Sequence, residues 1–148
     1  MRKIMVGVLL ITSFLLSACG LFVSREAVCK MEASDGSLIS QTFKADGSNV
    51  HEFIYEWNTP MNADQNDINE DEFARALFGD LVDEAGVVVE NTSTKTNFTV
   101  KVTIDLDTVN YQKLQDAGLA PKGDYDRFGY DETLKALKNT KGITCEEK

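Results

Sequence analysis

The chain has 148 residues, and its 24 acidic side chains outnumber its 15 lysines and arginines, so the formal net charge at pH 7 is −9. This length suits one domain with a hydrophobic core and is too short for two domains of ordinary size. Such an acidic chain is a poor candidate for binding nucleic acid, which depends on basic surface. We expect no cofactor, and no metal, because the chain has one histidine and no Cys-x-x-Cys pair.

Residues 1–18 have the layout of an export signal. Two cations, Arg2 and Lys3, precede an apolar run from Ile4 to Leu16, which is shorter than the roughly 20 residues that span a bilayer. The sequence Leu16-Ser17-Ala18-Cys19 then resembles the bacterial lipobox. The resemblance implies that the Cys19 thiol receives a diacylglyceryl lipid, palmitate being the typical acyl group, and that a peptidase cleaves before it. The alternative is a soluble secreted protein with a chance cysteine at the boundary.

Cleavage leaves a lipidated Cys19, a short tether to residue 26, and one α+β domain over residues 27–148. Loss of Arg2 and Lys3 removes two positive charges and no acid, so the mature net charge is −11. Anionic headgroups repel such a surface, and the tether from Gly20 to Glu26 reaches at most about 24 Å. We therefore expect the domain to stand close to the extracytoplasmic side of a cell membrane without being embedded in it.

Two cysteines remain besides the lipidated one. Export permits oxidation, so we expect a disulfide between Cys29 and Cys145, at the two ends of the domain. Two free thiols or a partial metal site are the alternatives.

Three strands open the domain. The segments 27–33, 38–45 and 50–57 are separated by the tight turns Ser34-Asp35-Gly36-Ser37 and Asp46-Gly47-Ser48, so we expect an antiparallel meander. Alternation over the third strand puts Val50 on one face, and on the other His51, Phe53, Tyr55 and Trp57. Thr59-Pro60 is expected to break the sheet.

Helices and strands then mix. Asp67 and Glu70 resemble a capping box that starts a helix running to about Glu84. Strands follow at 87–92 and 98–106, the second with strict alternation of apolar and polar residues. Short helices are expected over 110–117 and from Asp131 to the stop at Gly142, and 143–145 can pair with the sheet. The order β-β-β-α-β-β-α-α predicts an α+β fold with an antiparallel sheet of five to six strands covered by helices.

One segment, Val102-Thr103-Ile104-Asp105-Leu106-Asp107-Thr108-Val109-Asn110-Tyr111-Gln112-Lys113-Leu114, runs from the last long strand through an acidic turn into a helix. With the lipobox, it resembles the YehR-like family of small uncharacterised bacterial lipoproteins. The resemblance implies an α+β fold and membrane anchoring, and it implies no activity.

Three features of the sequence are candidate sites. His51 is alone among aromatic residues, which favours packing over catalysis, and no G-x-S-x-G elbow accompanies it. The oxygen-rich segment from Asn62 to Glu72 fails the EF-hand pattern at its glycine and glutamate positions, so an acidic helix start is the better interpretation, with a cation site as the alternative. The aromatic loop with Tyr125, Phe128 and Tyr130 is a candidate ligand pocket, or a lid of the core.

We therefore expect a non-enzymatic lipoprotein of the cell envelope, with no catalytic residues, that binds a small ligand or an envelope protein. A structural or adhesion-type interaction module without a small ligand is the second hypothesis, and a carboxylate-based hydrolase is the third.

Overall fold

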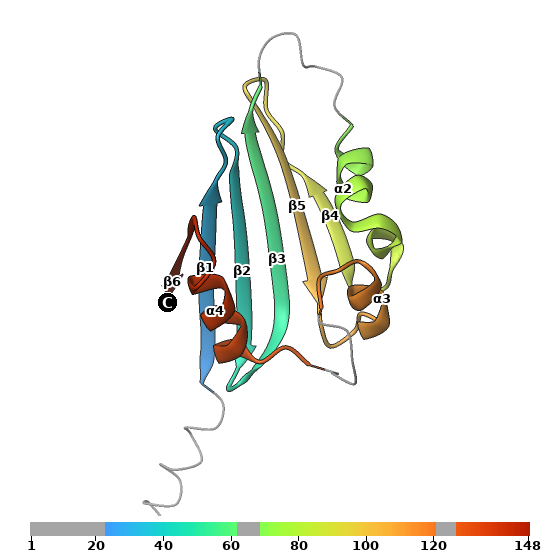
Figure 1. Ribbon diagram of the computed structural model, residues 1–148. Coiled ribbons are helices and arrows are strands. Elements are labelled where there is room, and N and C mark those ends of the chain that lie inside the picture. Colours follow the sequence, from blue (N-terminus) through green and yellow to red (C-terminus); the bar gives the residue numbers. More distant parts are fainter. Residues whose placement is uncertain (1–22, 62–68, 121–126) are drawn as a thin grey trace, which may run out of the picture.

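The computed structural model describes residues 23–61, 69–120 and 127–148. These residues form a six-stranded sheet in the order β4-β5-β3-β2-β1-β6, with all neighbouring strands antiparallel (Figure 1). The strands are β1 (Ser24–Glu32), β2 (Leu38–Asp46), β3 (Asn49–Pro60), β4 (Val87–Asn91), β5 (Asn97–Asp105) and β6 (Ile143–Glu147). The helices are α2 (Glu70–Phe78), the 3₁₀ turn η2 (Gly79–Asp83), α3 (Tyr111–Asp116) and α4 (Tyr130–Lys138). The expected α+β class and element order are confirmed, including the final edge strand.

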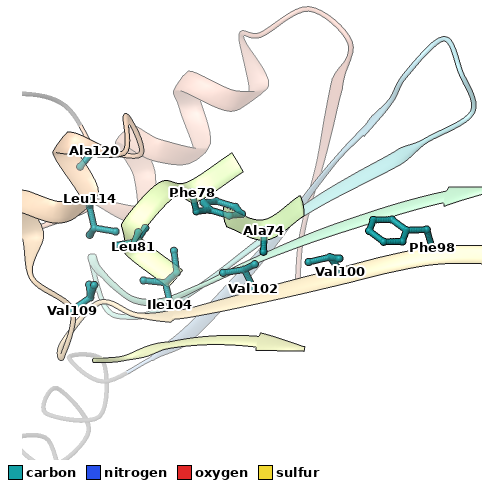
Figure 2. Close-up of a cluster of buried hydrophobic side chains, with 10 residues drawn as sticks. All are labelled: Ala74, Phe78, Leu81, Phe98, Val100, Val102, Ile104, Val109, Leu114 and Ala120. Atoms are coloured by element: carbon teal, nitrogen blue, oxygen red, sulfur yellow. The ribbon is translucent and has the colours of Figure 1, made fainter. Parts of the chain in front are cut away.

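The helices cover one face of the sheet in two separate groups. The larger core cluster packs α2, η2 and α3 against β5, as the side chains of Ala74, Phe78 and Leu81 beside Val102 and Ile104 show (Figure 2). The smaller cluster packs α4 against the start of β1 and the hairpin of β2 and β3. Phe53, Leu106 and Phe128 contact both clusters. The middle of this face therefore lies between the two groups of helices.

The opposite face of the sheet is polar. Its strands carry ion pairs between neighbours, with 2.7 Å from Lys44 Nζ to Glu52 Oε1 and 2.8 Å from Lys101 Nζ to Glu90 Oε2. The expected alternation in β5 is confirmed, because Phe98, Val100, Val102 and Ile104 are all buried on the helical face. One covered and one wet face is the usual arrangement of an antiparallel sheet.

The expected faces of β3 are wrong at its beginning. The pairing with β2 shifts between Lys44 and Ala45, so that Ala45 lies opposite Val50 while Lys44 lies opposite Glu52. This β-bulge inserts His51 as an extra residue and reverses the alternation before it. Val50 is therefore buried with Ala45 in the smaller cluster, and His51 does not share the aromatic face.

Pro60 does not break the sheet. It is the last residue of β3 and lies opposite Asn97 of β5, while β2 on the other side already begins at Leu38 opposite Asn58. A proline lacks only the backbone N–H, and at a position with one neighbouring strand that loss is tolerated. Met61 continues the pairing by donating its N–H to the carbonyl of Thr96.

The helix expected to run to Glu84 is shorter. It begins at Glu70 behind the cap residue Asn69, whereas Asp67 lies outside the described residues. It ends at Phe78, because Gly79 has a positive φ of 58°, and the chain continues as the tighter η2. Likewise α4 ends at Lys138 with Asn139 as its C-cap, before Gly142.

The sheet begins earlier than expected. Ser24, Arg25 and Glu26 belong to β1 and lie opposite Asp46, Ala45 and Lys44 of β2, where the sequence predicted a tether. Both core clusters consist entirely of residues from Ala27 onward. A chain that starts near residue 20 therefore retains both core clusters of the described residues.

Candidate functional site

A hollow of about 700 Å³ lies on the helical face of the sheet, between the two core clusters. Its floor is a cross-strand row in which Phe43 lies opposite Phe53 and Phe53 lies opposite Ile104. The pleat sends these three side chains to the same face. The hollow is open to solvent on part of its surface, and its volume falls within the range of about 300–1,000 Å³ typical of small-molecule sites.

The walls come from the two helical groups. The described residues that line the hollow are Gln41, Phe43, Phe53, Ile104, Leu106, Leu114, Gly118, Leu119, Arg127, Phe128, Gly129, Glu132, Thr133, Ala136 and Leu137. One wall is the end of α3, and the other is the inward side of α4. The hollow exists because α3 and α4 cover opposite sides of one face, which leaves Phe53 between them only partly buried.

Helix α4 is fixed to the sheet by charged and aromatic contacts. Arg25 of β1 donates two hydrogen bonds to the carboxylate of Asp131, at 2.8 and 3.3 Å, and its guanidinium lies 4.0 Å from the ring centre of Tyr130. The Arg25 hydrogen bond holds the pKa of Asp131 below its usual value. Glu147 of β6 accepts from Lys138 at 3.1 Å and lies 3.6 Å from Arg25. These contacts set the position of one wall.

The segment before α4 is held by backbone pairing. Val50 donates its N–H to the carbonyl of Phe128 at 2.9 Å, and Tyr130 donates to the carbonyl of Ser48 at 2.8 Å. This pairing holds Phe128 in the lining of the hollow, where its ring centre lies 5.7 Å from that of Tyr111. The β2–β3 hairpin therefore holds the segment that carries Phe128 into the hollow.

Of the described residues that line the hollow, four have polar side chains, Gln41, Arg127, Glu132 and Thr133, and the others are apolar or glycine. Glu132 stands three residues after the N-cap Gly129, and its Oε2 occupies the space that a Cβ on that glycine would need. The Glu132 carboxylate therefore lies against the N-cap residue of its own helix. Such a lining can hold an apolar molecule and orient it with a few polar contacts.

The three residues of the candidate pocket have different positions. Phe128 lines the hollow, while Tyr125 lies outside the described residues. Tyr130 is 2% exposed and belongs to the smaller core cluster, where burial raises the pKa of its hydroxyl. Sequence reasoning did not identify the strand row or the side chains of α4. The two phenylalanines that flank the β2–β3 hairpin, Phe43 and Phe53, were the signal that could have indicated the floor.

His51 lies outside the hollow, on the wet side of the sheet. Its Nε2 is 3.8 Å from Oδ2 of Asp46, and it is close enough to Asp105 to help lower the pKa of that carboxyl. The main cause of the low Asp105 pKa is the hydrogen bond from the Thr108 hydroxyl. The bulge therefore places His51 in an acidic surface cluster.

The acidic segment is described only from Asn69 onward. Asn69 accepts the backbone N–H groups of Asp71 and Glu72, at 3.0 and 3.3 Å, so it caps α2. Asn62 to Asp67, together with Ile68, lie outside the described residues. Among those that are described, no three His, Cys, Asp or Glu side chains are grouped so that they could hold a metal ion.

The expected disulfide is confirmed. Cys29 of β1 and Cys145 of β6 lie directly opposite each other in the sheet and are bonded, with 4.0 Å between their Cα atoms. Cys29 is 2% exposed and belongs to the smaller core cluster. Cys19 lies outside the described part of the chain, within which no helix is both long and apolar enough to cross a membrane.

Comparison with known proteins shows which solved structures have a similar fold. No protein-family model matches the chain, and no significant match is found among curated proteins. The NMR structure of the YehR protein of Escherichia coli is similar with a TM-score of 0.56 and 21% identity, over 75% of this chain and 84% of that one. The NMR structure of a protein from Streptococcus pneumoniae TIGR4 is similar with a TM-score of 0.56 and 14% identity, over 84% of this chain and 86% of that one. The chain therefore has a YehR-like fold.

Proposed function

We propose that the chain is a lipoprotein of the bacterial cell envelope that binds a small, mainly apolar ligand in the hollow between α3 and α4. The observation that carries the binding proposal is the hollow itself, with its aromatic floor and its few polar groups. The proposed anchor is lipid on Cys19, supported by the match of residues 16–19 to the lipobox. Two acyl chains hold a protein stably to a bilayer, whereas one does not.

The hollow lies at the end of the sheet where the tether enters. Ser24 begins β1, and Ala27, three residues on, lies opposite Phe43 of the floor. From Cys19 to Ser24 the chain can span at most about 17 Å. A domain anchored at Cys19 therefore keeps the hollow near the membrane surface, within reach of molecules that concentrate there.

A protein-docking module is the less supported function. The large apolar side chains exposed among the described residues are Val23 before β1, Leu38 in β2, Leu77 in α2 and Val88 in β4. Scattered apolar residues are normal on a soluble surface, whereas protein-binding sites usually present a contiguous patch.

Binding is tested with a neutral fluorescent probe, N-phenyl-1-naphthylamine, titrated into a chain that starts at residue 20. We expect saturable binding that Ala136→Trp abolishes, because Ala136 lines the hollow and is exposed, so the indole fills the space without disturbing the core. Lys135→Trp is the matched control on the same helix and should leave binding unchanged. Absence of saturable binding, or equal effects of the two variants, would overturn the binding proposal.

Anchoring is tested in cells with the full chain and radiolabelled palmitate. We expect label on the wild-type protein, which fractionates with the membrane, and none on Cys19→Ala. A Cys19→Ala variant that is still labelled and still processed would show that the lipobox interpretation is wrong.

A further inference from the structure

A glutamine beside the floor of the hollow narrows the class of ligand. This step rests on the proposed binding function. Strand β2 sends Ile39, Gln41 and Phe43 to the helical face, because alternate residues of a strand share a face. Ile39 and Phe43 are buried, and among the described strand residues that line the hollow, Gln41 is the one with a polar side chain. Its amide therefore interrupts an otherwise apolar part of the sheet.

The neighbours of Gln41 do not use its amide. Gln41 is partly buried and lies opposite Cys29 of β1 and Tyr55 of β3. No hydrogen bond joins its amide to another residue in the part of the chain that the structure describes. An amide withdrawn from water without a partner destabilises a folded protein. A bound molecule that pairs with this amide therefore explains its position better than folding does.

The lining favours a neutral ligand. Arg127 and Glu132 have opposite charges and both line the hollow, so together they select neither sign of charge. Thr133, on the wall formed by α4, adds a neutral hydroxyl that has no hydrogen bond to the described residues. A charged ligand would also lose hydration among lining residues that are mostly apolar. A neutral hydrogen-bonding group suits this hollow better than an ion.

We propose that the hollow binds a neutral, mainly apolar molecule that carries an amide group, and that this amide pairs with the amide of Gln41. An amide has both a donor N–H and an acceptor C=O, so two amides can form two hydrogen bonds side by side. An ether lacks the donor, and a hydroxyl has a single oxygen for both roles. The apolar body of the ligand lies on Phe43, Phe53 and Ile104, which form the next cross-strand row on the same face.

The head group is tested with compounds that share one alkyl chain and end in a primary amide, an alcohol, a methyl ether, a carboxylate or an amine. Each compound competes with the neutral probe for the chain that starts at residue 20. We expect the amide to bind most tightly, and the ether to bind more weakly than the alcohol. The proposal is overturned if any other member of the series binds as tightly as the amide.

The role of Gln41 is tested with Gln41→Leu, which keeps the size of the side chain and removes its amide. This variant should bind the primary amide about tenfold more weakly, as expected for the loss of two neutral hydrogen bonds, and should bind the ether as the wild type does. Thr42→Val, at the next residue of β2 and on the opposite face, is the matched control and should change neither affinity. A Gln41→Leu variant that still prefers the amide would contradict the assignment.

Unfolding experiments separate a binding role of Gln41 from a structural one. Because its amide has no partner among the described residues, Gln41→Leu should unfold at the same temperature as the wild type or at a higher one. A lower unfolding temperature would show that Gln41 holds the fold together, and would overturn the assignment. If the neutral probe does not bind, the binding function itself is wrong, whereas a probe that binds without any preference for the amide overturns the amide assignment alone.

Discussion

Gly86 occupies a position that suits no other residue. Its φ is +86°, and a Cβ there would lie 3.0 Å from Cβ of Thr108, 3.1 Å from the carbonyl oxygen of Asp105 and 3.2 Å from the backbone nitrogen of Val109. Gly86 also accepts the N–H of Asp105 at 2.7 Å. The turn before β4 and the turn after β5 are therefore packed backbone against backbone.

Gly86→Ala is expected to lower the free energy of unfolding by roughly 2–4 kcal/mol, because it adds a steric clash to the ~1–2 kcal/mol of left-handed strain. Gly142→Ala is the matched control. Its φ is +87° but nothing lies within 4 Å of the added Cβ, so it should lose only the strain. Urea unfolding measures both, and equal losses would mean that the turn relaxes around the methyl group at no cost.

At the scale of single residues, the sequence predicts burial where apolar and polar residues alternate regularly along a strand, and it does not predict where a bulge interrupts that alternation. The burial of Phe98 to Ile104 follows from strict alternation. The position of His51 does not, because one inserted residue reverses the alternation and leaves no trace in composition. Cys29 and Cys145 could be paired in advance because export and the proposed lipidation of Cys19 leave two thiols.

Asn69 defines where α2 begins. Its side-chain oxygen accepts two backbone N–H groups that would otherwise have no partner in the helix. Asn69→Ala should lower the free energy of unfolding by about 1 kcal/mol, whereas Asn69→Asp should retain the stability, because aspartate caps equally well. Thermal unfolding of the two variants measures the difference, and an alanine variant as stable as the wild type would contradict the assigned cap.

Whole elements were predicted better than their ends. The three-strand meander follows from two tight turns, and the short helices follow from apolar spacing. The ends depend on neighbours that the sequence does not reveal. Pro60 stays in β3 because β2 begins at Leu38, opposite Asn58, and so has no residue opposite Pro60. Helix α2 ends before Gly79, although the apolar spacing of the sequence continues past that glycine.

The hollow is a property of the whole molecule, and it could not be predicted. The hollow exists because α3 and α4 cover opposite sides of one face. The packing of each helix against the sheet determines this arrangement. Of the candidate residues, Phe128 lines the hollow, while Tyr130 belongs to the smaller core cluster. Aromatic residues in a loop indicate burial, and they do not distinguish a pocket from a core.

The disulfide closes almost the whole domain, because Cys29 and Cys145 are 116 residues apart. Closing a loop of this length stabilises the folded state by about 4–5 kcal/mol in the chain-entropy model. Replacing both cysteines by alanine should therefore lower the free energy of unfolding by up to that amount, measured by urea unfolding. A reductant should lower the stability of the wild type and have no effect on the double variant; a wild type indifferent to reductant would contradict this role.

The place of β1 in the sheet has a mechanical consequence. Tension that enters at Ser24 runs along β1, which is flanked by β2 on one side and by β6 on the other. Antiparallel hydrogen bonds lie across the strand axis, so this pull shears many of them together instead of peeling them one at a time. The bond between Cys29 and Cys145 transfers part of the load to β6. When the tether is pulled, the domain therefore resists unfolding through hydrogen bonds to the strands on both sides of β1 and through the disulfide.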